Sequence, residues 1–305
     1  MSRINEALRR VGDADPAAEP AADGQPHFAP AWPVSGVTEA PGEPEAATPA
    51  TPPAPVRQAE LRRESERAVA PAGTTVQGFS SKWRECLASG PEGDPGLIEQ
   101  FRRLAGTLHH AQHANGLRSV MVTSAAPGDG KTLTAVNLAL VLSESYRANV
   151  LLVDADLRRP SIPSVVESGQ GAGLSEALRA ATEQKLALVN LTPRLTLLPA
   201  GQPIANSLDA LTSPRMQQIL KEATTRFDWV ILDAPPVGPT ADARLLTEMV
   251  GGTLFVVHAG KTQCPEVQKA IDAIGSERIL GVVLNGVAPE PHAHYYGVVP
   301  AGSRD

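Results

Sequence analysis

From residue 119 onward, short apolar runs alternate with segments in which apolar residues recur every three to four positions. The runs are rich in Val, Ile and Leu without polar alternation, which is typical of parallel strands buried on both faces. We therefore predict an α/β fold with a mostly parallel central sheet and helices on both faces. The expected strands are 119–125, 149–157, 195–201, 229–236, 253–260 and 279–287, and the expected helices begin at 131 or lie near 174–181, 213–226, 241–250 and 265–275.

A further amphipathic helix is predicted directly before the first strand. Asp94 is a suitable N-cap, Pro95 suits the first helical position, and Asn115-Gly116 is a typical stop signal. The apolar face of this helix consists of Leu97, Phe101, Leu104 and Leu108.

The N-terminal part of the chain has a different composition. Of the 28 prolines, 14 fall within the first 95 residues. Such a segment buries too little apolar surface to offset its ordering entropy, so we expect a disordered Pro/Ala-rich linker over 12–93. Before it, 1–11 form a short amphipathic helix with Ile4, Leu8 and Val11 on one face, which is either a fraying start helix or a docking peptide.

Charge and cysteine content exclude several classes of protein. The formal net charge is −6, so there is no broad basic surface for nucleic acid. Cys86 and Cys264 match no metal-binding spacing, and a reduced compartment is the default expectation. No run approaches about 18 apolar residues, so we expect no membrane-spanning segment.

The segment "TSAAPGDGKTLTAVNLA" has the context of a phosphate-binding loop, between an apolar strand and a helix. Gly128 and Gly130 allow the backbone to approach phosphate, Lys131 can reach the β- and γ-phosphates, and the Thr132 hydroxyl can bind Mg²⁺. The glycine expected at the start of such a loop is replaced by Ala125.

Aspartates follow two other predicted strands. Asp154 and Asp156 lie in "LLVDADLRRP", followed by Arg158, and Asp233 lies in "WVILDAPP". Because ligands bind beyond the carboxyl ends of parallel strands, these carboxylates are expected beside the phosphate loop, where they can bind Mg²⁺ and accept a proton.

These three motifs in this order, with "GTLFVVHAGKT" and "GVVLNGV" behind them, resemble the cytoplasmic kinase domain of bacterial tyrosine kinases over roughly residues 94 to 297. "MSRINEALRR" also resembles the start of stand-alone members encoded beside exopolysaccharide genes. The resemblance implies ATP and Mg²⁺ as cofactors, Lys131, Asp154 and Asp156 as catalytic residues, and Thr132, Asp156 and Asp233 as metal ligands. It also implies a kinase domain over 94–290 and a nucleotide site made of Gly128, Asp129, Gly130, Lys131, Thr132, Leu133, Arg158 and Asn285.

Division-site and plasmid-partition ATPases share this fold, but they carry an extra lysine five residues before the loop lysine. That position is Ala126 here, which argues against such an ATPase.

By the same resemblance, the phosphate acceptors are tyrosines near the C-terminus. Tyr295 and Tyr296 lie in a predicted flexible tail over 291–305, and Tyr146 is expected to belong to the core or the helix surface. A packed terminal pair is the alternative for Tyr295 and Tyr296.

The family's ring-forming motif, Glu-x-x-Arg-x-x-Arg, is incomplete, because Glu99 and Arg102 match and Ala105 does not. A homo-oligomer is therefore possible by resemblance and weakened by this position. His109 and His113, spaced i, i+4, are expected on a solvated face rather than at a metal.

The predicted function is an ATP-dependent protein tyrosine autokinase that regulates capsular or exopolysaccharide biosynthesis and export. A membrane polysaccharide co-polymerase would activate it and recruit it from the cytoplasm to the inner face of the membrane, without nucleic acid as a partner. The alternative is an ATP-switched assembly factor of the same system that lacks kinase activity.

Overall fold

The computed structural model describes residues 78–89, 93–167, 171–180, 186–238 and 241–287, and the account below concerns these ranges. They include a seven-stranded sheet in the order β3-β4-β2-β5-β1-β6-β7, in which every neighbouring pair is parallel except β3 and β4. The predicted mostly parallel α/β fold is confirmed. The strands are β1 Ser119–Ser124, β2 Val150–Asp154, β3 Val189–Thr192, β4 Leu195–Leu198, β5 Trp229–Asp233, β6 Gly252–His258 and β7 Ile279–Asn285.

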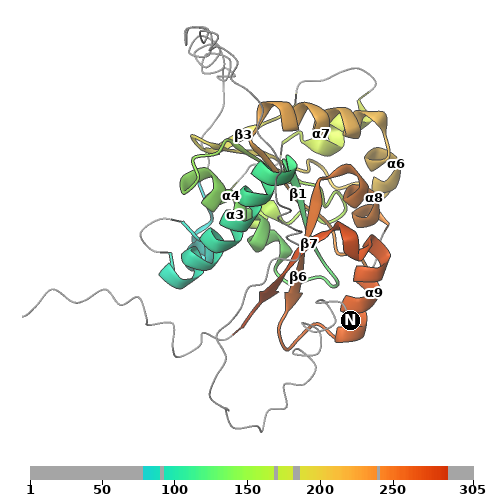
Figure 1. Cartoon of the computed structure of the whole chain (residues 1–305). Coiled ribbons are helices and arrows are strands. Elements are labelled where there is room, and N and C mark those ends of the chain that lie inside the picture. The colour runs from blue at the N-terminus through green and yellow to red at the C-terminus, as the bar shows by residue number, and fades with distance from the viewer. Residues whose placement is uncertain (1–77, 90–92, 168–170, 181–185, 239–240, 288–305) are drawn as a thin grey trace, which may run out of the picture. The chain divides into compact units, whose positions relative to one another are not determined.

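Helices cover both faces of the sheet, with α3 and α4 on one side and α8 and α9 on the other (Figure 1). The α-helices are α3 Pro95–Asn115, α4 Lys131–Glu144, α5 Leu174–Arg179, α6 Ser207–Leu211, α7 Pro214–Arg226, α8 Asp242–Met249 and α9 Cys264–Ile274. Three short 3₁₀ helices are η1 Ser81–Cys86, η2 Ile162–Ser164 and η3 Ser276–Arg278. None of the helices in the described ranges has the length and hydropathy needed to cross a bilayer.

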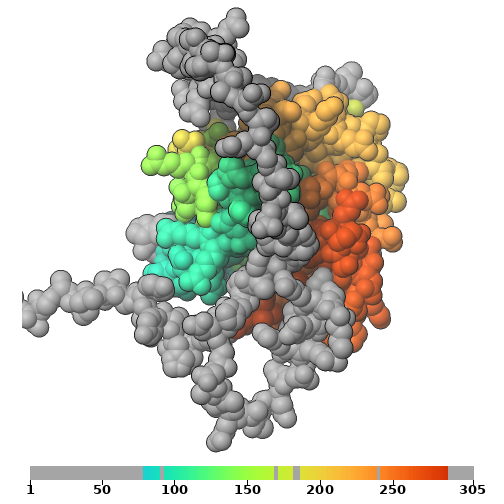
Figure 2. All heavy atoms as spheres, viewed as in Figure 1, coloured from blue at the N-terminus to red at the C-terminus, as the bar shows by residue number. Residues whose placement is uncertain are grey.

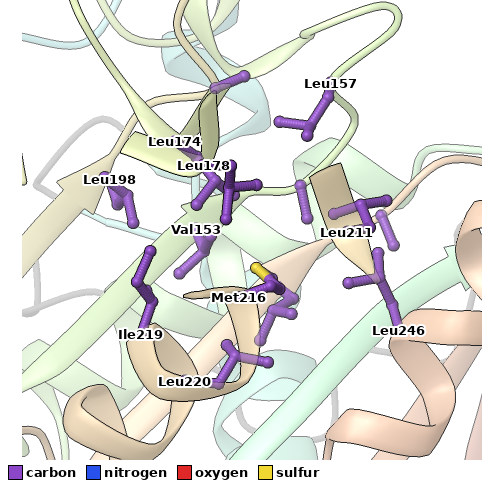
Figure 3. Packing of buried hydrophobic residues seen from close by; sticks show 14 of the residues in the cluster. Val153, Leu157, Leu174, Leu178, Leu198, Leu211, Met216, Ile219, Leu220 and Leu246 are labelled. Atoms are coloured by element: carbon purple, nitrogen blue, oxygen red, sulfur yellow. The ribbon is translucent and has the colours of Figure 1, made fainter. Parts of the chain in front are cut away.

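The central strands are apolar because both of their faces are covered. All residues of β1, β2 and β5 are buried, and α4 is buried along most of its length between the sheet and α3. Figure 3 shows one half of the core, where Met216, Ile219 and Leu220 of α7 pack near Val153 of β2 and Leu246 of α8. Burial of each such side chain contributes about 1.5–3 kcal/mol, which holds the strand ends in place.

The predicted helix before the first strand is confirmed with its caps. The Asp94 carboxylate accepts a hydrogen bond of 2.8 Å from the Gly96 amide, and α3 ends at Gly116, whose φ is +69°. Phe101, Leu108 and Ala105 face the core.

The packed domain begins earlier than the predicted Asp94. Within the predicted linker 12–93, residues 78–80 pair with 165–167, and 86–89 lie on α4, where the Asn137 side chain accepts from the Ala88 amide and donates to the Cys86 carbonyl, both at 2.8 Å. Leu87 and Ala88 are buried. Sequence reasoning missed this segment because its few apolar residues are surrounded by polar ones. The expected helix 1–11, most of the linker and the tail 291–305 lie outside the described residues.

Figure 2 shows that α7, α8 and α9 share one continuous surface. The phosphate loop that follows β1 leads into α4, so its residues lie at the carboxyl edge of the sheet between the two layers of helices.

Candidate active site

The phosphate loop spans the six residues between the end of β1 and Lys131, the first residue of α4. Gly128 and Gly130 have φ values of +85° and +96°, a region that glycine enters at little cost. A Cβ at position 130 would clash with the side-chain amide of Asn285, so a side chain there would displace the Asn285 side chain from the loop. The two glycines are therefore required by backbone conformation and by space.

Ala125 does not need to be glycine. It lacks a positive φ, and its side chain packs in an apolar cluster with Val237 and Phe255. A methyl group therefore fits and is buried at this position, and the missing glycine does not disturb the loop.

Asp129 connects the loop to the far edge of the sheet. Its side chain is 1 % exposed, and its two oxygens accept from the Thr262 hydroxyl at 2.7 Å and from the Ala126 amide at 3.0 Å. The Asn285 amide donates to the Asp129 carbonyl at 2.9 Å, and Lys261 Nζ lies 3.4 Å from the Gly128 carbonyl oxygen. The predicted nucleotide residues Asp129 and Asn285 are therefore in direct contact, and both help to fix the conformation of the phosphate loop.

Lys131 and the predicted carboxylates Asp154, Asp156 and Asp233 lie close together at the carboxyl ends of β2 and β5. Asp154 and Asp233 are directly paired in register at the ends of β2 and β5, and both are fully buried. Lys131 Nζ lies 3.5 Å from an oxygen of Asp156 and 4.0 Å from an oxygen of Asp233. The predicted clustering at the carboxyl edge is therefore what the structure shows.

This cluster has more negative than positive charge, which changes its acid–base properties. Burial, followed by the neighbouring Asp233 and Asp156, raises the pKa of Asp154 well above its usual value. Burial raises the pKa of Asp233 to about 6, while Lys131 and the Thr132 hydroxyl lower it and Asp156 raises it. Asp154 therefore binds a proton more readily than an exposed aspartate, and in its ionised form it can accept the proton of a hydroxyl group.

The residues also fit Mg²⁺. Neither oxygen of Asp233 has a hydrogen bond of good geometry from the described residues, although both are fully buried. In the described ranges no three His, Cys, Asp or Glu side chains converge as a metal cage. Mg²⁺ needs no such cage, since it usually retains water and phosphate oxygens beside one or two protein ligands. Asp233 and Thr132 would hold it, with Asp156 nearby.

Arg158 lies in a separate polar cluster. Its Nε is 3.0 Å from an oxygen of Asp242, which also accepts from the Ser207 hydroxyl. Asp242 is 1 % exposed, and its other oxygen has no partner among the described residues. The structure therefore pairs Arg158 with Asp242. The predicted nucleotide residue Leu133 is half-buried on α4.

The incomplete ring motif has a structural basis on α3. Ala105 is fully buried, Arg103 pairs with Glu99 at 3.4 Å, and the Arg102 guanidinium lies 3.4 Å from the Ser145 hydroxyl. The Tyr146 hydroxyl donates to the Arg102 carbonyl at 3.1 Å, so Tyr146 belongs to the α3–α4 packing as expected.

Another predicted pair, His109 and His113, lies on α3. The rings of His109 and His113 contact each other on α3 with 3.1 Å between their Nε2 atoms, and no third ligand from the described residues joins them. The predicted acceptors Tyr295 and Tyr296 lie outside the described residues.

Sequence reasoning missed Thr262, Lys261 and Ser207. The first two follow β6 in "HAGKT", and their position just after a strand was a usable signal. Only the order of the sheet, with β6 beside β1, brings that turn to the phosphate loop.

Comparison with known proteins agrees with the geometry. A family model described as "ParA: NUBPL iron-transfer P-loop NTPase" matches residues 117–289. The chain is 34% identical over 201 residues to the tyrosine-protein kinase YwqD of Bacillus subtilis, a match that covers 65% of this chain and 84% of YwqD. It is 31% identical over 195 residues to the succinoglycan biosynthesis transport protein ExoP of Rhizobium meliloti, covering 62% of this chain and 25% of ExoP.

A solved structure gives the same result. The kinase domain of the Escherichia coli tyrosine kinase ETK superposes with a TM-score of 0.60 at 29% identity, covering 70% of this chain and 91% of that domain. The phosphate loop, the strand-end aspartates and these similarities agree with one another. The chain belongs to the bacterial tyrosine kinases of the ParA-type P-loop NTPase family.

Proposed function

We propose that this protein is an ATP-dependent protein tyrosine kinase that modifies its own C-terminal tail. The observation that carries the proposal is the cluster of Lys131, Asp154, Asp156 and Asp233 beside the phosphate loop. A simple nucleotide-binding loop needs the lysine and one carboxylate. The additional buried Asp154, with its raised pKa, supplies a proton acceptor for a hydroxyl nucleophile.

The side chains divide the work as follows. Backbone amides of the loop and the start of α4 bind the phosphates, and Lys131 compensates their charge. Thr132 and Asp233 would hold Mg²⁺, which neutralises charge on the phosphates when it is bound. Asp154 takes the proton of the attacking tyrosine hydroxyl, and Asp156 orients Lys131 through their ion pair.

Tyr295 and Tyr296 are the proposed acceptors. Tyr295 lies ten positions after Asn285 in the sequence, a reach of at most about 35 Å for an extended chain. Asn285 itself contacts the loop, so the tail starts at the active-site edge and can enter the site of its own or another copy.

The similarity to ExoP supports a place in polysaccharide biosynthesis and export. The match covers 25% of ExoP, so three quarters of that protein has no counterpart in the alignment. We propose that a separate membrane polysaccharide co-polymerase supplies the functions of that unaligned part. This partner would also activate the kinase and recruit it to the inner face of the cytoplasmic membrane.

The second candidate is an ATP-switched assembly factor without kinase activity. The buried Ala105 favours it. The family's ring motif has a subunit-joining arginine at this position, whereas here the position holds an alanine whose side chain faces the core and cannot contact a neighbouring subunit. This candidate predicts ATP-dependent partner binding that survives replacement of both tail tyrosines.

One experiment separates the two candidates. The purified protein is incubated with Mg·ATP, with and without the cytoplasmic segment of the membrane partner, and phosphotyrosine is mapped by mass spectrometry. Label on Tyr295 or Tyr296 that disappears in the Tyr295→Phe/Tyr296→Phe variant supports the kinase. Absence of label under both conditions contradicts it.

A further inference from the structure

The turn that follows β6 makes an unusual contact with the phosphate loop. Its backbone is closed by hydrogen bonds from the Lys261 and Thr262 amides to the His258 carbonyl, at 3.3 Å and 3.1 Å. The Thr262 hydroxyl accepts from the His258 amide at 3.3 Å and donates to Asp129 at 2.7 Å. One hydroxyl therefore links this turn to a residue of the phosphate loop 133 positions earlier in the chain.

Asp129 passes this link across the loop. Its second oxygen accepts from the Ala126 amide at 3.0 Å, so the carboxylate bridges the first half of the loop to the turn after β6. Both Thr262 and Asp129 are buried, at 7 % and 1 % exposure. A buried carboxylate that loses one of its donors has no water to replace it, which makes this bond costly to break.

We propose that Thr262 is a positioning residue for nucleotide binding, acting through Asp129 on the phosphate loop. The inference rests on the proposed function, because it concerns the same nucleotide site. Gly128 and Gly130 give the loop great conformational freedom in the absence of ligand. The two hydrogen bonds that link Thr262 to Asp129 and Asp129 to Ala126 restrict the loop before the nucleotide binds. Less of the binding free energy is therefore spent on ordering the loop.

The contact from Lys261 supports the same assignment. Its ammonium lies 3.4 Å from the Gly128 carbonyl, so two consecutive residues of one turn hold two consecutive residues of the loop. Lys261 is exposed and its bond is long, so it contributes less than the buried Thr262.

The test compares three threonine variants by isothermal titration with Mg·ADP. Thr262→Val removes the hydroxyl at constant shape and is expected to weaken binding about tenfold, from the loss of one hydrogen bond to a buried carboxylate. Thr262→Ser keeps the hydroxyl and is expected to bind within about threefold of the unchanged protein. Thr253→Val is the matched control, because the Thr253 hydroxyl on β6 is buried and has no partner among the described residues.

A purely structural role would give another pattern. If Thr262→Val lowers the melting temperature of the nucleotide-free protein and still binds Mg·ADP like the unchanged protein, the proposal is overturned. If the unchanged protein itself does not bind Mg·ADP, the proposed function fails, and the positioning role fails with it.

Asp129→Leu provides a second variant in case Thr262→Val does not fold. Leucine has a similar shape and no acceptor, so it loses both bonds, to Thr262 and to Ala126. We expect Mg·ADP binding to weaken at least tenfold here. Unchanged affinity in Asp129→Leu would overturn the bridge from Thr262 to the loop.

Discussion

Two buried aspartate sites, one at Asp129 within the phosphate loop and one around Lys131, differ in how their charges are compensated. Around Asp129, every carboxylate oxygen has a donor, from Thr262 and from the Ala126 amide. Around Lys131, the carboxylates of Asp156 and Asp233 share one ammonium group, and both Asp233 oxygens lack a well-formed hydrogen bond from the described residues.

The two sites therefore have different roles, the first in fixing the loop conformation and the second in binding and reaction. The Asp129 site is complete without ligand, so it fixes the shape of the loop in advance. The Asp233 site is incomplete, and a divalent cation with its phosphates would supply the missing positive charge. A buried unpaired carboxylate destabilises the empty protein, and such a cost is typical of a binding site.

Replacement of Lys131 should have the largest effect of these changes, measured as loss of phosphoryl transfer. Lys131→Met removes the only ammonium that the structure pairs with Asp156 and Asp233. We expect phosphoryl transfer to fall about 100- to 1,000-fold, as for other preorganised charges that stabilise a transition state. Transfer is measured with radiolabelled ATP on protein whose fold is checked by circular dichroism. Lys261→Met serves as the control, and equal losses in both variants would contradict a special role for Lys131.

Asp154→Asn should separate binding from transfer. A neutral amide cannot take the tyrosine proton, so phosphorylation is expected to fall about 100-fold or more. Mg·ADP affinity should change little, and the nucleotide-free protein should melt at a higher temperature at pH 8, because the substitution removes repulsion among buried carboxylates. Full phosphorylation by Asp154→Asn would show that the base is another residue.

Stability and metal binding should depend on pH through Asp233. Because its pKa is raised from 3.8 to about 6, this group costs the metal-free protein stability progressively as pH rises between these values. Mg²⁺ requires the ionised carboxylate. At pH 5 only about a tenth of Asp233 is ionised, so Mg²⁺ affinity should be about tenfold lower than at pH 7.5.

Thermal unfolding with and without Mg·ADP measures both effects. Asp233→Asn should abolish the pH dependence of the Mg²⁺ effect over this range. A Mg²⁺-dependent stabilisation that is equal at pH 5 and pH 7.5 in the unchanged protein would exclude Asp233 as the titrating ligand.

The smallest effect is expected at Asn285. Asn285→Ala removes one hydrogen bond to the Asp129 carbonyl, and Mg·ATP affinity should fall about fivefold. If Asn285 acts only on the loop, the preference for ATP over GTP stays constant. A changed preference in competition titrations would show instead that the side chain faces the base, as the family resemblance implies.

Much of the site could be predicted from local sequence. Gly128, Gly130, Lys131 and Thr132 are adjacent in the chain, so their spacing alone defines a loop that meets phosphate. Asp154 and Asp233 were predicted because strand ends of a parallel sheet meet at one edge. The partner of Arg158 could not be predicted, since Asp242 and Ser207 come from helices whose positions depend on packing.

The beginning of the domain was also decided by packing. Residues 78–89 show no apolar periodicity, and they are held on the domain partly by the Asn137 side chain, which bonds the backbone of Cys86 and Ala88. A single polar side chain on a distant helix leaves no periodic signal in the sequence of the segment that it holds.

The sequence by itself determined the order of strands and helices, the phosphate loop and the identity of the strand-end carboxylates, because each depends on local periodicity or on adjacent residues. Only the tertiary structure decided which aspartate is satisfied and which is left incomplete. That distinction depends on β6 lying beside β1 and β7 beside β6, because this order brings Thr262 and Asn285 to Asp129, while Asp233 has only the Lys131 ammonium, at 4.0 Å, as a cationic partner among the described residues.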